Sequence, residues 1–319
     1  MKYEVREIAP ADLHLIRPLF RQVFKADISE AMLAWKYAAG VGRAYGYFND
    51  AGELLVHCGL SYRRVLADGQ PRRIAHMGDL MAASGRHGGL GRASAFAHVI
   101  RRMLDDIPDE HNPDGLAFGF PSDRAMRLGE QMGLFASIDQ MRQLTFGPLP
   151  RRWSADRLVM VTTPDSSFCK LADQLWQGMA EELGEGLVVI RDADYLAFRY
   201  FSHPSLRYAC HLVKPWWGGQ ALGIVITRCE GRQCELVDLI APPAAVGRLI
   251  KAVRQHLAGW GVDALTLWLT ERHAAAVEGQ AQSNDRLELR IMANPFSSGG
   301  QPERFANRWW LTSGDTDYH

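Results

Sequence analysis

The residues that decide the fold run from 79 to 92 and read Asp79-Leu80-Met81-Ala82-Ala83-Ser84-Gly85-Arg86-His87-Gly88-Gly89-Leu90-Gly91-Arg92. The pattern over residues 74–83 predicts a strand, and an amphipathic pattern from about 92 to 104 predicts a helix. The glycines between them let the backbone approach a ligand without a Cβ clash. Free amides at a helix start favour an anion, and the two arginines can bond a phosphate. We therefore predict an anion-binding turn; a plain glycine-rich turn is the alternative.

Two other phosphate-binding loops fit the sequence less well. A P-loop requires Gly-Lys followed by Ser or Thr, and the chain contains no such triplet. A dinucleotide-binding fingerprint that begins at Gly89 requires glycine or alanine where Ser94 stands. It also requires an acidic residue at the end of a strand about 20 residues later, and no clear strand ends that way.

The composition is that of an ordinary globular protein. The chain has 319 residues, of which 47% are hydrophobic and 23% charged, and its length predicts about two domains. The 36 basic residues balance 36 acidic ones, which argues against broad nucleic-acid binding. No apolar run is long enough to predict a membrane span, and the N-terminus lacks the apolar region of a secretory signal.

The cysteines form no C-x-x-C pair, so we expect reduced thiols, no zinc site and a cytoplasmic location. They are Cys58, Cys169, Cys210, Cys229 and Cys234.

The second half of the chain repeats features of the first. Trp35-Lys36-Tyr37 has its counterpart in Phe198-Arg199-Tyr200, at an offset of 163, and Asp79 has its counterpart in Asp238, at an offset of 159. Near-constant offsets indicate a duplication. Residues 147–155 are rich in proline and polar residues and are interpreted as the linker. We predict the α/β (α+β) class with domains at 1–150 and 151–319, each a mixed twisted sheet flanked by helices.

The motif Arg86-x-x-Gly89-x-Gly91 resembles the acyl-CoA pyrophosphate loop of the GNAT-type N-acetyltransferases. Residues 79–83 resemble that family's central strand, whose backbone meets the pantetheine arm. Residues 119–125, continuing to Gly133, resemble its next strand and helix. The resemblance covers about residues 2–150 and is weaker over 156–319, as in tandem members with one degenerate half.

This resemblance implies acetyl-CoA or another acyl-CoA as co-substrate. The residues that it implies for cofactor binding are Met81, Ala82, Ala83, Arg86, His87, Gly88, Gly89, Leu90, Gly91, Arg92 and Ser122. The corresponding loop of the second half, residues 241–247, has lost the glycines, and its Pro242 and Pro243 carry no N–H group. We infer that this half does not bind CoA.

The implied chemistry is direct attack of an amine on a thioester, which needs a base and donors for the oxyanion. Strand amides near Met81 and Ala82 are the candidate donors. Asp79 and His76 are the candidate catalytic residues, and an unbroken strand would place them on opposite faces. A strand-end carboxylate bonded to backbone and a half-buried strand histidine are the respective alternatives. His57, on the neighbouring strand, is a weaker candidate.

The sequence departs from the family at Gly129, where many members have a tyrosine that acts as general acid. Val and Pro, frequent in the family, are replaced by Met81 and Ala83. The aromatic–cation triplets at 35–37 and 198–200 could line an acceptor site, or they could form core corners. Asp315 and Asp317 could contact the acceptor, or they could belong to a solvated terminus.

We therefore expect an N-acyltransferase that moves an acyl group from acyl-CoA to a small-molecule amine. The expected partners exclude nucleic acid and membrane spans, no metal is expected, and a homodimer is left open. A non-catalytic acyl-CoA sensor or assembly protein is the alternative. A transferase that uses aminoacyl-tRNA is less favoured, because the net charge is zero.

Overall fold

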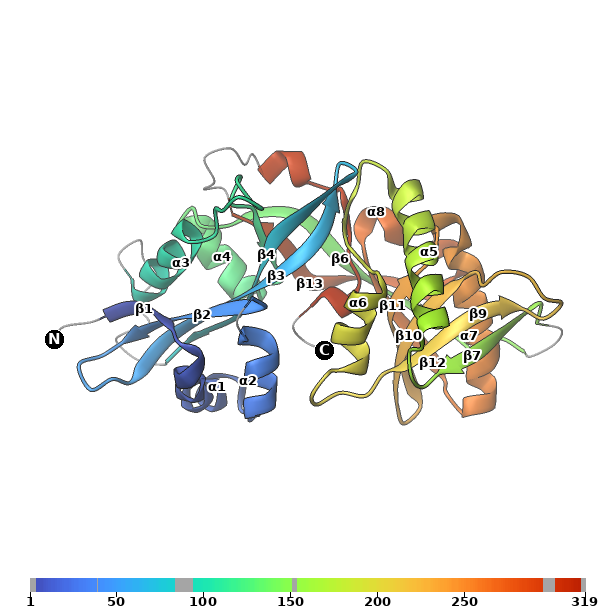
Figure 1. Cartoon of the computed structure of the whole chain (residues 1–319), viewed down its shortest axis with the longest axis horizontal. Helices are drawn as coiled ribbons and strands as arrows, with labels where there is room; N and C mark the ends of the chain where they lie inside the picture. The colour runs from blue at the N-terminus through green and yellow to red at the C-terminus, as the bar shows by residue number, and fades with distance from the viewer. Residues whose placement is uncertain (1–3, 39, 84–93, 151–153, 295–301, 317–319) are drawn as a thin grey trace. The chain divides into compact units, whose positions relative to one another are not determined.

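The computed structural model describes residues 4–38, 40–83, 94–150, 154–294 and 302–316. These residues form two compact units (Figure 1). Unit 1 comprises residues 1–64, 72–139 and 288–306, and unit 2 comprises residues 65–71, 140–287 and 307–319. The units therefore interleave along the chain. The division between residues 150 and 151, expected from the sequence, separates the two sequence repeats rather than these two units.

Unit 1 has a mixed sheet in the order β1-β2-β3-β4-β5-β13. Its strands are β1 Glu4–Ile8, β2 Gly42–Phe48, β3 Leu54–Ala67, β4 Gln70–Ala82, β5 Ala117–Gly119 and β13 Ser283–Ala293. Its helices are α1 Ile16–Phe24, α2 Glu30–Tyr37, α3 Ala95–Asp105 and α4 Asp123–Gln131. The end of β3 and the start of β4 belong to unit 2, as does the start of β13.

The two faces of this sheet have separate cores. Val56, Cys58 and Leu60 of β3 pack with the apolar face of α3, while Ala44 and Met81 pack with α1 and α2. Strand residues alternate between faces, so one sheet can serve both cores. In Figure 1, α3 and α4 accordingly lie above this sheet, and α1 and α2 lie below it.

Unit 2 repeats this strand order as β7-β9-β10-β11-β12-β6. Its strands are β6 Ala136–Phe146, β7 Asp156–Val161, β9 Ala209–Pro215, β10 Gly223–Glu230, β11 Gln233–Ile240 and β12 Ala264–Thr270, with the short β8 Leu187–Val189 and β14 Trp309–Trp310. Its helices are α5 Ser166–Leu183, α6 Ala193–Leu196, α7 Val246–Trp260 and α8 Glu271–Ala274, and a π-helix, Ala197–Phe201, follows α6.

Each unit takes its sixth strand from the other half of the sequence. In unit 1, Met292 and Ala293 of β13 pair antiparallel with Gly119 and Phe118 of β5. In unit 2, residues 141–146 of β6 pair antiparallel with residues 265–270 of β12. The equal strand order of the two units supports the duplication, and this exchange explains why they interleave.

One expectation about the cysteines is wrong. Cys229 and Cys234 form a disulfide, so the five thiols are not all reduced. The physical reason is the β10–β11 hairpin, whose register places these two residues directly opposite each other. Cys58, Cys169 and Cys210 are free. Within the described residues, no helix is long and apolar enough to cross a membrane.

Candidate functional site

The site in unit 1 is built around the end of β4. This strand pairs in parallel with β5 only from Ala75 to Met77, opposite Ala117 to Gly119. It then continues to Ala82, so its last five residues have no β5 partner in the described chain. Ala83 N–H donates to the Leu55 carbonyl of β3 at 2.8 Å. Because amides alternate in direction along a strand, Ala82 N–H points to the opposite edge, on the side of β5.

A bulge at Asp79 changes which side chains share a face of β4. Asp79 has a φ of +49°, in the left-handed region. Met77 and Leu80, three residues apart, both pack in the α3 core, whereas strict alternation would separate them. His76 and Asp79 consequently lie together on the face of α1 and α2. The expectation that they face opposite sides is wrong, because it assumed an unbroken strand.

The Asp79 carboxylate is held by the end of α2. Lys36 Nζ lies 2.8 Å from Oδ1 and 2.7 Å from Oδ2, and the Tyr37 hydroxyl donates to Oδ2 at 2.5 Å. All three side chains are largely buried. Gly59 leaves room for this contact, because a Cβ there would come within 2.1 Å of the Tyr37 hydroxyl oxygen. The triplet at 35–37 therefore forms a core corner whose cation and tyrosine hold Asp79.

His57, the weaker candidate, contacts this bulge directly. Its Nδ1 lies 2.9 Å from the Asp79 carbonyl oxygen. A carbonyl can only accept, so Nδ1 carries the proton and Nε2 has the free lone pair. Nε2 is buried and has no hydrogen-bond partner in the described structure. Burial lowers the pKa of His57, which keeps the ring neutral at pH 7. His57 thus holds the bulged carbonyl and carries an unprotonated ring nitrogen on this face.

His76 lies beside the aromatic side chains of the β5 segment. Its ring centroid is 4.9 Å from that of Phe118 and 5.7 Å from that of Phe120, and its side chain is buried. The Ser61 hydroxyl is 3.4 Å from Nδ1. His76 therefore lies in the part of β4 that pairs with β5, whereas Asp79 lies beyond that pairing.

The remaining predicted cofactor residues fall into two groups. Ala82 and Ala83 lie at the end of β4, Met81 packs toward α1 and α2, and Ser122 caps α4 by accepting from Ala125 N–H at 3.4 Å. The loop residues lie outside the described chain: Arg86, His87, Gly88, Gly89, Leu90, Gly91 and Arg92.

Gly129 is required by packing. A Cβ at this buried position of α4 would lie 2.0 Å from Cδ2 of Phe135. A tyrosine therefore has no room here while Phe135 keeps its position. The tyrosine that the resemblance implies as a general acid is therefore incompatible with the packing at this position.

Unit 2 has a buried polar centre that corresponds to the one at Asp79, but a different cation binds its carboxylate. The Tyr200 hydroxyl donates to Asp238 Oδ2 at 2.7 Å, as the Tyr37 hydroxyl does to Asp79. A register shift near Asp238 also gives β11 an irregularity at the corresponding place. The neighbouring cation is Arg191, whose Nε lies 2.9 Å from Asp238 Oδ1. Among the described residues, no three His, Cys, Asp or Glu side chains lie together in a way that could hold a metal ion.

The C-terminal tail lies between β11 and β12 in unit 2. These two strands pair in parallel only over Gln233–Leu236 and Ala264–Leu267. Beyond them, Thr312 forms a bridge with Leu269, and the Ser313 hydroxyl donates to the Val237 carbonyl at 3.3 Å. The tail thus contacts both strands where they have separated.

Asp315 anchors this tail in the interior of unit 2. Its carboxylate accepts from Arg191 Nη2 at 2.5 Å, and both side chains are buried. Both expectations for Asp315, contact with an acceptor and a place in a solvated terminus, are therefore wrong, because its carboxylate is buried against Arg191. Asp317 lies outside the described residues.

A histidine beside the tail makes the stability depend on pH. His273 lies 4.7 Å from Trp310 between ring centroids, and burial lowers its pKa to about 4. The unfolded chain binds this proton near the ordinary pKa of 6.5, so stability falls as the pH drops below 6.5 and levels off near 4. Between pH 7 and pH 5, the free energy of unfolding of His273→Gln should fall by about 1–2 kcal/mol less than that of the wild type, a figure that allows for the partial exposure of His273. Urea unfolding at both pH values measures this, and equal losses in the two proteins would contradict it.

The comparisons with known proteins agree on the fold. No protein-family model and no curated protein matches the sequence. Among solved structures, a protein of Enterococcus faecalis V583 described as a probable N-acyltransferase has a TM-score of 0.70 at 14% identity, over 92% of this chain and 72% of that one. A tandem GNAT protein from the clavulanic acid biosynthesis pathway has a TM-score of 0.59 at 13% identity, covering 94% of this chain and 100% of that one.

The likeness extends to a eukaryotic enzyme. Saccharomyces cerevisiae N-myristoyltransferase with bound myristoyl-CoA has a TM-score of 0.57 at 10% identity, over 98% of this chain and 86% of that one. At such low identities the likeness concerns the fold. The chain has the fold of the GNAT N-acetyltransferases, in a tandem arrangement.

Proposed function

We propose that this protein is an N-acyltransferase that moves an acetyl or other acyl group from acyl-CoA to a small amine. The observation that carries the proposal is the end of β4 in unit 1. Five residues there extend beyond the pairing with β5, and the Arg86-x-x-Gly89-x-Gly91 motif follows directly in the sequence. The backbone edge at Ala82 offers a hydrogen-bond donor to a thioester carbonyl.

In the proposed reaction, the amine nitrogen bonds to the acyl carbon and the carbon–sulfur bond of the thioester breaks. The amine proton passes to a base on the α1–α2 face of β4, and the electron pair leaves with the CoA thiolate. Asp79 and His76 remain the proposed catalytic residues, and His57 joins them because its Nε2 carries a lone pair on the same face. The Lys36 and Tyr37 contacts fix the orientation of the Asp79 carboxylate.

Only unit 1 is proposed to bind acyl-CoA. In unit 2 the tail residues Thr312 and Ser313 lie between β11 and β12, where unit 1 leaves β4 unpaired. The prolines at 242 and 243 remove amides from the loop that follows β11. Both observations support a role for unit 2 in binding the acceptor or in stabilising unit 1.

A thiol-release assay with a panel of small amines tests this proposal. We expect the right amine to accelerate CoA release from acetyl-CoA or a longer acyl-CoA at least about tenfold. Asp79→Asn should lower kcat/KM by about 100-fold, because a positioned group that transfers a proton contributes at least about that factor to the rate. Asp114→Asn, which removes an exposed partner of Arg72, is the matched control.

The second candidate function is a non-catalytic acyl-CoA sensor, and the packing of Gly129 against Phe135 favours it. A sensor would bind acyl-CoA with the same affinity but release no CoA with any amine. Equal rates with and without every amine, in a protein that binds acyl-CoA, would therefore select the sensor over the enzyme.

A further inference from the structure

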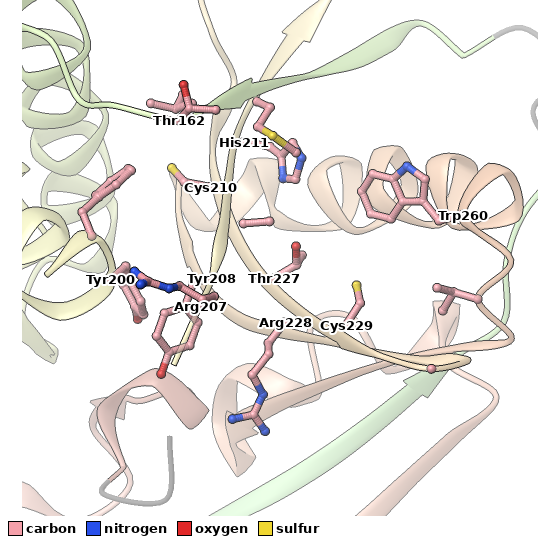
Figure 2. A pocket seen from close by; sticks show the side chains of 16 residues that line it. Thr162, Tyr200, Arg207, Tyr208, Cys210, His211, Thr227, Arg228, Cys229 and Trp260 are labelled. Atoms are coloured by element: carbon pink, nitrogen blue, oxygen red, sulfur yellow. The ribbon is translucent and has the colours of Figure 1, made fainter. Parts of the chain in front are cut away.

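Unit 2 contains a cavity of about 690 Å³. It lies where β7 ends, β9 begins and β10 ends, and the last turn of α7 contributes to its wall (Figure 2). A volume of this size falls within the range of small-molecule sites. The cavity uses no residue of unit 1, so it is separate from the proposed acyl-CoA site.

The charge of the lining favours an anion. Arg207 and Arg228 line the cavity, and its lining contains no aspartate or glutamate. Arg207 is exposed. Arg228 lies 3.7 Å from Glu230 and 3.6 Å from Glu235, distances longer than good charge-assisted hydrogen bonds. Both guanidinium groups can therefore engage a carboxylate or phosphate.

The aromatic side chains favour a flat apolar body beside that anionic group. Tyr208 and Trp260 both line the cavity, and Trp260 is 42% exposed, which is unusual for such a large apolar side chain. The Trp260 ring is stacked on His211, with 5.7 Å between centroids and 29° between planes. An indole held in place by a second ring is a ready surface for a planar ligand.

Two buried polar atoms in the wall lack partners. His211 Nδ1 and Thr227 Oγ1 have no hydrogen bond within the described structure, although both side chains are almost fully buried. Such atoms are rare in folded proteins, and each would gain a hydrogen bond if a water or ligand reached it. The two side chains come from adjacent strands, β9 and β10 (Figure 2). The Cys229–Cys234 disulfide ties the β10 side of this wall to β11.

We propose that this cavity is a binding site for a small anionic molecule with a planar apolar body. Arg207 and Arg228 bind its carboxylate or phosphate, and Trp260 and Tyr208 contact the planar body. This proposal does not rest on acyl transfer, because all lining residues belong to unit 2 and binding can be measured without any acyl-CoA.

Calorimetric titration with two matched probes, 1-naphthoate and its neutral amide 1-naphthamide, tests the site. We expect saturable binding of naphthoate at one site per chain, at least tenfold tighter than that of naphthamide. 1-Naphthyl phosphate separates a preference for phosphate from one for carboxylate. The double variant Arg207→Gln/Arg228→Gln should weaken naphthoate at least tenfold and leave naphthamide unchanged.

Two further variants define the contacts. Trp260→Ala should weaken both probes, since it removes the stacking surface that they share. Arg232→Gln is the control, because Arg232 lies in the same β10–β11 hairpin but pairs with Asp263 and does not line the cavity. Unchanged melting temperatures establish that each variant is folded. No saturable binding of naphthoate or naphthyl phosphate, equal affinity for naphthoate and naphthamide, or wild-type binding by the double arginine variant would overturn the proposal.

Discussion

Replacement of Arg191 by methionine is expected to lower the free energy of unfolding by about 3–5 kcal/mol. Arg191 is fully buried and binds two carboxylates, with Nε 2.9 Å from Asp238 and Nη2 2.5 Å from Asp315. Methionine fills similar volume but supplies no charge, so two carboxylates remain buried without the cation that they share. The cost of such unpaired groups is much larger than the value of the pair itself.

The control for this prediction is Arg232→Met. Arg232 and Asp263 form a two-bonded ion pair with side chains 72% and 53% exposed, so its loss should cost far less than the loss of Arg191. Urea unfolding at pH 7 measures both variants. Adding Asp315→Asn to Arg191→Met should recover part of the loss, because it removes one unpaired charge. Similar small losses for both arginines would show that the tail is not anchored in the interior of unit 2.

Substitution of Gly129 is expected to have the second-largest effect. Gly129→Ala should cost about 2–3 kcal/mol, because a Cβ there would lie 2.0 Å from Phe135 and the ring must move. Gly129→Tyr, which introduces the residue that many GNAT enzymes carry there, should cost more and should not raise activity. The helix propensity gained by replacing glycine, about 1 kcal/mol, is too small to offset the clash.

A double-mutant cycle separates this clash from other effects. Phe135→Leu makes room beside α4, so Gly129→Ala should cost markedly less in that background. Gly279→Ala is the control, since a Cβ there meets no atom within 4 Å and should change stability by less than about 0.5 kcal/mol. A Gly129→Ala protein as stable as the wild type would contradict the steric explanation for the missing tyrosine.

Much of the fold could be predicted from local patterns. The strand before the glycine-rich loop and the helix after it are present as β4 and α3, and the strand and helix expected over 119–133 correspond to the end of β5 and to α4. The aromatic–cation triplets also marked equivalent places in the two units. These features are local in the sequence, so capping, periodicity and spacing reveal them.

Most of the errors concern contacts between distant residues, and the Cys229–Cys234 disulfide within one hairpin is an exception. The exchange of β6 and β13 depends on pairings over more than 100 residues, which no local pattern encodes. The bulge at Asp79 broke the alternation on which the faces of His76 and Asp79 were predicted. Lys36 and Tyr37 were singled out, but their bond to Asp79 required the tertiary structure. The buried role of Asp315 similarly depends on Arg191, 124 residues away.

The most direct test of the central claim is calorimetric titration of the whole chain with acetyl-CoA and a longer acyl-CoA. The proposal predicts one site per chain, lost in Gly89→Glu. Ala244→Glu, in the corresponding loop of unit 2, should leave binding unchanged, because that unit is proposed to bind no CoA. Two sites per chain, or binding that survives Gly89→Glu and disappears in Ala244→Glu, would contradict the assignment of the site to unit 1. No binding of either acyl-CoA to the wild type would contradict acyl-CoA-dependent function altogether.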